Sequence, residues 1–117
     1  MGFYARITLH RELGRMNRLI EDKQEELKQL CEQFKVRRFE LFGSAADGSF
    51  DPQTSDLDFL VEFLELQPGK HFNAYFGLLE ALQSLFGRPV DLVMTRAIKN
   101  PYFLKSVNQT RTVLYAA

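Results

Sequence analysis

Two aspartates, Asp56 and Asp58, stand one residue apart in the alternating segment DLDFLVEF. Because successive side chains of a strand point to opposite faces, both carboxylates lie on one face, roughly 6–7 Å apart along the backbone. Such a pair repels itself unless a proton or a cation relieves the charge. Mg²⁺ prefers hard oxygen ligands and takes one or two carboxylates together with substrate phosphates. The spacing therefore indicates a divalent-metal site, with Glu62 on the same face but farther along and solvated.

A third carboxylate, Asp91, lies inside the apolar segment VDLVM, which predicts a strand over Val90–Met94. An aspartate inside such a strand is costly if it is buried and unpaired. If this strand pairs with the strand that carries Asp56 and Asp58, Asp91 completes an acidic triad. Three carboxylates can hold two metal ions about 3.5–4 Å apart, which is the arrangement used for in-line phosphoryl or nucleotidyl displacement.

A glycine–serine pair, Gly43-Ser44, ends the preceding predicted strand. Glycine lets the backbone approach a phosphate closely, and the serine hydroxyl and the N–H groups that follow can donate to phosphate oxygens. A phosphate-binding turn joined by a short loop to a metal-binding strand is what a nucleoside triphosphate with Mg²⁺ requires.

The elements that must position these residues follow from hydrophobic periodicity and turn signals. The pattern predicts a helix over 16–34, strands over 36–42, 56–63, 90–94 and 112–115, a turn or one helical turn over 45–51, and helices over 71–86 and 101–107. This order predicts an α/β (α+β) domain with a small mixed β-sheet and helices on one face. The uncovered face carries Asp56, Asp58 and Asp91.

Two apolar stripes are assigned to the core. The stripe of the helix over 71–86 includes Phe72, Tyr75, Phe76 and Phe86, and an exposed patch for a partner is the alternative for part of it. Cys31 lies on the stripe of the first helix and is interpreted as a core residue.

Composition bounds the class of protein. The 117 residues include fifteen basic and fifteen acidic side chains, so a nucleic-acid-coating protein is not expected. We expect one domain over 1–117, with a helical segment over 1–35 and a catalytic core over 36–117. No apolar run reaches the ~18 residues of a membrane span, no signal core is present, and one cysteine excludes an internal disulfide. The expected location is the cytoplasm, without a membrane.

The motif set resembles a known family. Gly43-Ser44, eleven residues, Asp56-Leu57-Asp58 and then Asp91 resemble the polymerase-beta-type nucleotidyltransferases, and more narrowly the minimal nucleotidyltransferases, over Val36 to Tyr115. The resemblance implies a nucleotidyltransferase fold that uses two Mg²⁺ ions and ATP. It implies that Gly43 and Ser44 contact the triphosphate and that Asp56, Asp58 and Asp91 are the catalytic residues that hold the metals. Asp91 would also take the proton of the incoming hydroxyl.

Two departures from the family pattern bear on activity. The spacer has eleven residues where ten is commoner, a change that a loop absorbs. Asp47 stands where many relatives carry an arginine. A carboxylate cannot neutralise phosphate, so the effect of Asp47 on catalysis stays open.

The acceptor is implied only by the resemblance. Larger members carry a second helical domain that binds the acceptor, and at this length we expect something else to bring it. Minimal nucleotidyltransferases of this type are antitoxins that transfer AMP to a tyrosine of a partner HEPN ribonuclease toxin. A catalytically weak antitoxin that acts by binding, and an enzyme that modifies a small molecule such as an aminoglycoside, are the alternatives. The nucleotide preference, the number of AMP units and the oligomeric state stay open.

Overall fold

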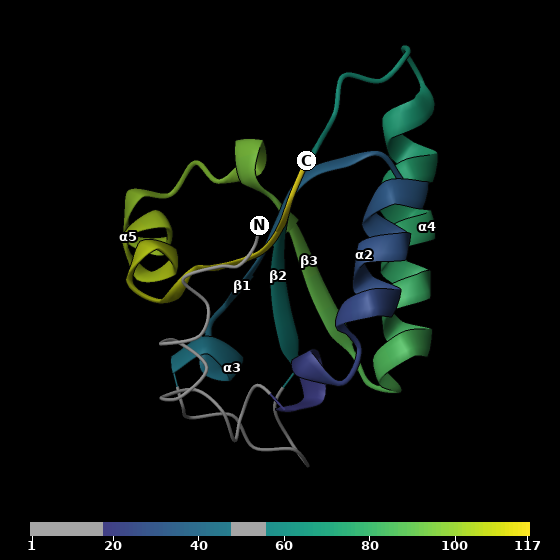
Figure 1. Ribbon diagram of the computed structural model, residues 1–117. Coiled ribbons are helices and arrows are strands. Elements are labelled where there is room, and N and C mark those ends of the chain that lie inside the picture. Colours follow the sequence, from purple (N-terminus) through teal and green to yellow (C-terminus); the bar gives the residue numbers. More distant parts are fainter. Residues whose placement is uncertain (1–17, 48–55) are drawn as a thin grey trace.

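The computed structural model describes residues 18–47 and 56–117. Its centre is a four-stranded mixed sheet in the order β3-β2-β1-β4 (Figure 1). Strand β1 is antiparallel to β2 and β4, whereas β2 and β3 are parallel because a helix crosses between them. The elements are α2 (Gln24–Gln33), β1 (Val36–Phe42), α3 (Ser44–Asp47), β2 (Leu57–Phe63), α4 (Lys70–Phe86), β3 (Val90–Met94), a 3₁₀ turn (Thr95–Ala97), α5 (Pro101–Thr110) and β4 (Thr112–Ala116).

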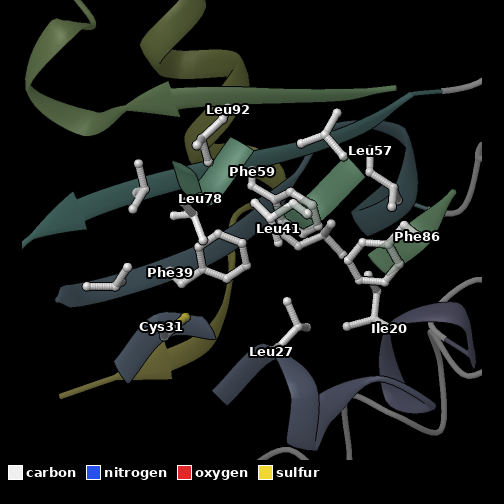
Figure 2. Close-up of a cluster of buried hydrophobic side chains, with 14 of the residues drawn as sticks. Ile20, Leu27, Cys31, Phe39, Leu41, Leu57, Phe59, Leu78, Phe86 and Leu92 are labelled. Carbon is white, nitrogen blue, oxygen red and sulfur yellow. The ribbon is translucent and has the colours of Figure 1, made fainter. Parts of the chain in front are cut away.

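The main core lies between the sheet and the helices α2 and α4, which pack beside each other on one face (Figure 1). Strand periodicity places alternate apolar side chains on that face, and Figure 2 shows Phe39, Leu41 and Phe59 among them. The rings of Phe39 and Phe59 stack with centroids 4.7 Å apart, and the ring of Phe86 lies 5.9 Å from Phe59. Cys31 is fully buried in this core, as expected, and burial raises the pKa of its thiol to about 12.

The fold class is confirmed, but the second face of the sheet is more covered than expected. Helix α5 lies on the side opposite α2 and α4 (Figure 1). Its buried Val107 packs against Phe42 and Leu60, which point away from the main core because strand side chains alternate. The predicted helices on one face are therefore α2 and α4 only, and α5 covers part of the second face, on which Asp58 and Asp91 lie.

The first predicted helix is interrupted. Residues 18–21 are helical, a turn follows at 22–23, and α2 begins at Gln24. The Lys23 N–H donates to the Ile20 carbonyl three residues back, at 3.0 Å, and this bond breaks the regular helical ladder. Residues 1–17 lie outside the described part of the chain, so the helical prediction for them is untested.

Local signals predicted where α4 ends and where α5 begins. Gly87 adopts a left-handed φ of 63° and its N–H donates to the Gln83 carbonyl, which stops α4. The Asn100 side chain accepts hydrogen bonds from the N–H groups of Tyr102 and Phe103 and caps α5. Helix α5 continues three residues beyond the predicted end.

The assignment of the aromatic stripe of α4 to the core was wrong for two residues. Phe72 is 69% exposed and Phe76 is 49% exposed, whereas Phe86 is buried. The helix buries Leu82 and Phe86, which lie on the predicted stripe, together with Leu78, which does not, while Tyr75 and Leu79 are partly buried against the core. Within the described residues no helix is long and apolar enough to cross a membrane.

Candidate active site

The two aspartates that the sequence placed on separate strands are neighbours in the sheet. Strands β2 and β3 pair in parallel with Asp58 opposite Asp91. Residues opposite each other in register project from the same face, and adjacent strands lie about 4.8 Å apart. The strand pairing on which the acidic site depended is therefore present.

The charges at this site act on one another. Burial, and after it the negative charges of Asp91 and Asp56, together raise the pKa of Asp58 to about 6. Asp58 is partly buried, whereas Asp91 is exposed. A bound cation would relieve this repulsion, and the oxygen donors present suit Mg²⁺.

Asp56 lies one residue before the start of β2 and is exposed. It therefore stands outside the strand in which the sequence placed it, although its charge is felt at Asp58. Within the described residues no three acidic, histidine or cysteine side chains converge closely enough to form a ready-made metal site. The protein thus brings Asp58 and Asp91 together and keeps Asp56 nearby, without an assembled triad.

Gly43 lies against the Asp58 carboxylate. Phe42, the last residue of β1, is the register partner of Asp58, and the chain turns at Gly43 with a φ of 77°. A Cβ on Gly43 would overlap Asp58 Oδ2 and would lie 3.3 Å from Asp58 Cγ. The turn therefore requires glycine at this position for two reasons: the backbone is left-handed, and the Asp58 carboxylate occupies the space that a Cβ would need.

The backbone groups of Gly43 are already engaged. Its N–H donates to Thr110 Oγ1 at 3.0 Å, and its carbonyl accepts from the Ala46 N–H at 2.9 Å. Donors for a phosphate at this turn must therefore come from the Ser44 hydroxyl and the N–H groups that follow. Asp47 ends α3, and its side chain and residues 48–55 lie outside the described part, so the predictions for them are untested.

A buried ion pair beside this turn escaped the sequence analysis. Glu40 is 2% exposed, and Arg111 donates to both of its carboxylate oxygens, at 3.0 and 2.7 Å. Arg38 Nε lies 3.1 Å from Glu40 Oε2. Burial alone would raise the pKa of Glu40, but the hydrogen bonds and charges of Arg111 and Arg38 hold it below its usual value. The available signal was an acidic residue between Phe39 and Leu41, the same kind of signal that identified Asp91.

A mixed sheet with two register-paired aspartates beside a glycine–serine turn defines a nucleotidyltransferase. The family model described as Nucleotidyltransferase domain matches residues 23–114, and the chain belongs to this family.

Three known proteins illustrate the relationship. The chain is 39% identical over 82 residues to MJ1379 of Methanocaldococcus jannaschii, a candidate protein adenylyltransferase, covering 70% of this chain and 80% of that protein. A solved structure of a candidate minimal nucleotidyltransferase matches with 30% identity and a TM-score of 0.64, covering 80% of this chain and 90% of that one. A chain in the complex of a tri-AMPylated Shewanella oneidensis HEPN toxin with an MNT antitoxin matches with 21% identity and a TM-score of 0.57. That match covers 83% of this chain and 72% of the other, and its low identity makes it a likeness of fold alone.

Proposed function

We propose that this protein is an Mg²⁺-dependent nucleotidyltransferase that moves AMP from ATP to a tyrosine hydroxyl of a partner HEPN toxin, and so acts as an antitoxin. The observation that carries the proposal is the pairing of Asp58 with Asp91 beside the Gly43–Ser44 turn, in a chain of the nucleotidyltransferase family. We assign metal binding and catalysis to Asp56, Asp58 and Asp91, and triphosphate binding to the turn of Gly43 and Ser44.

In the proposed reaction the acceptor oxygen attacks the α-phosphorus of ATP. A new oxygen–phosphorus bond forms, the bond from the α-phosphorus to the oxygen that bridges to the β-phosphorus breaks, and pyrophosphate leaves. Asp91 accepts the proton of the hydroxyl, a role that its exposed position permits. The Ser44 hydroxyl donates to a phosphate oxygen. Two Mg²⁺ ions held by Asp56, Asp58 and Asp91 would supply neutralisation of the phosphate charge.

The protein acceptor is supported by the relatives. MJ1379 carries the name of a protein adenylyltransferase, and the fold is shared with a chain in a complex of an AMPylated HEPN toxin with an MNT antitoxin. Both relatives therefore support an acceptor hydroxyl that belongs to a separate protein.

A second candidate function is an antitoxin that silences its partner by contact. Asp47 favours it, because relatives of the resembled family carry an arginine there and a carboxylate would repel phosphate.

The experiment is the intact mass of the protein that co-purifies with this chain, before and after addition of MgATP. Mass gains in steps of one AMP, absent with Asp58→Asn, are expected. Glu62→Gln is the matched control, because Glu62 lies on the same strand and face but pairs with the partly exposed Arg37 at 3.8 Å. No gain from a complex that still silences its partner would favour the contact antitoxin, and no partner at all would favour a small-molecule acceptor.

A further inference from the structure

Thr110, the last residue of α5, forms a hydrogen bond with the Gly43–Ser44 turn, which lies between β1 and β2 in the chain. Its Oγ1 accepts the hydrogen bond from the Gly43 N–H at 3.0 Å, across 67 positions of sequence. Thr110 Oγ1 also lies 3.5 Å from the Val107 carbonyl, to which its own hydroxyl can donate. The hydroxyl is therefore oriented by its helix, with a lone pair directed at Gly43.

The end of α5 is itself held in place from two sides. Arg111, the next residue, forms the two-pronged pair with the buried Glu40, and its third donor group binds Asn108 Oδ1 at 2.7 Å. Val107 is 1% exposed and packs against Phe42, the residue before Gly43. Because Glu40 and Phe42 belong to β1, the helix end and the turn are tied to the same strand.

We infer that Thr110 is a positioning residue for nucleotide transfer: its hydroxyl fixes the orientation of the Gly43 peptide and thereby the path of the turn between Asp58 and Ser44. This inference rests on the proposed function. With the amide held by Thr110, the turn keeps Gly43 against the Asp58 carboxylate and leads directly into Ser44, the first residue of α3. Loss of the hydroxyl frees the Gly43 amide to rotate, and small misplacements of groups that align substrates are costly to rate.

The test compares three variants of the whole chain. Thr110→Val removes the hydroxyl and keeps the shape, whereas Thr110→Ser keeps the hydroxyl. Thr112→Val is the matched control, because Thr112 Oγ1 donates to the Thr110 carbonyl at 3.1 Å and makes no bond to Gly43 in the described structure. Val is also well accommodated in β4, where Thr112 lies.

Two readouts need no turnover: hydrogen exchange of the Gly43 amide by NMR, and the affinity for MgATP by calorimetry. In Thr110→Val we expect the amide to exchange at least about fivefold faster, the equivalent of one lost hydrogen bond. We expect MgATP to bind about fivefold more weakly or worse, and Thr110→Ser and Thr112→Val to stay near the wild type. Where AMP transfer is observed, kcat falls between about tenfold and a hundredfold in Thr110→Val and is restored in Thr110→Ser.

The outcomes separate this inference from the proposed function. Wild-type MgATP affinity and kcat in Thr110→Val would overturn the positioning role, even with a faster Gly43 amide. Equal losses in Thr110→Val and Thr112→Val would also overturn it, because they would reflect general destabilisation. A wild-type protein that transfers no AMP would overturn the proposed function, and the MgATP affinities of the same variants would still decide the role of Thr110.

Discussion

The carboxylate of Asp58 occupies the space that a Cβ on Gly43 would need. Gly43 directly follows the last residue of β1, whereas Asp58 lies in β2, and the register that pairs Phe42 with Asp58 brings them together. The Asp58 carboxylate can therefore take its position only if the residue that follows β1 has no side chain, as Gly43 has none.

Gly43→Ala is expected to displace Asp58 and to disturb the turn. The added methyl overlaps Asp58 Oδ2 and the residue must keep a φ of 77°, so we expect about 2–3 kcal/mol of lost stability in urea unfolding and loss of transfer. Gly69→Ala is the matched control, since Gly69 has a φ of 86° but no atom within 4 Å of its added Cβ. It should lose about 1–2 kcal/mol and keep its activity. Equal activity in both variants would contradict the steric link.

Asp58→Asn is expected to stabilise the metal-free protein at neutral pH. Burial, with Asp91 and Asp56, raises the folded pKa of Asp58 from 3.8 to about 6. A raised pKa means that the folded state binds the proton of Asp58 more tightly than the unfolded state does. The stabilisation from this proton is therefore full below about pH 4 and is lost as the pH rises through about 6. After a discount for solvent screening, we expect Asp58→Asn to raise the free energy of unfolding at pH 7.5 by about 1–2 kcal/mol relative to the wild type.

Urea unfolding of the wild type and Asp58→Asn, in chelator, at pH 4 and pH 7.5 checks this. The two proteins should converge at pH 4 and differ at pH 7.5. A variant that is less stable than the wild type at pH 7.5 would show that the carboxylate is not repelled.

Mg²⁺ is expected to stabilise the wild type against urea, because a ligand that binds only the folded state shifts unfolding by mass action. At ten times its Kd the gain is about 1.4 kcal/mol. Asp58→Asn should lose most of this gain, while Glu62→Gln should keep it, and NaCl of equal ionic strength separates screening from binding. The same gain in all three proteins would argue against a site at Asp58, and removal of Mg²⁺ by chelator should abolish transfer.

Arg111→Met should unfold more readily than Arg37→Met. Arg111→Met leaves the charge of the buried Glu40 largely unpaired, which lowers the free energy of unfolding by about 3 kcal/mol. The Arg37–Glu62 pair, at 3.8 Å and half exposed, contributes less than about 1 kcal/mol to that free energy. Because the folded pKa of Glu40 is lowered, its stabilising contribution is present above its unfolded value near 4.5 and is lost as the pH falls. Arg111→Met therefore flattens the acid limb of the stability profile, which chemical unfolding between pH 3 and pH 7 measures. A profile parallel to that of the wild type would refute this.

The individual elements were largely predictable because their signals are local. Alternation placed β1 over Val36–Phe42, and Gly87 and Asn100 marked a helix end and a helix start. The exposure of Phe72 and Phe76 and the burial of Leu78 were not predictable, because all three fit an apolar stripe of α4. Which stripe is buried depends on where the sheet lies, and periodicity along one helix does not contain that information.

The candidate site divides in the same way. The residue types and spacings of Gly43, Ser44, Asp56, Asp58 and Asp91 predicted the nucleotidyltransferase class, to which the family model also assigns the chain. The tertiary structure decided the pairing of Asp58 with Asp91 and the contact of Asp58 with Gly43. It also decided the hydrogen bonds of Thr110 to Gly43 and of Arg111 to Glu40. Each joins residues far apart in the chain through strand register and helix docking, which depend on how all the apolar faces pack at once.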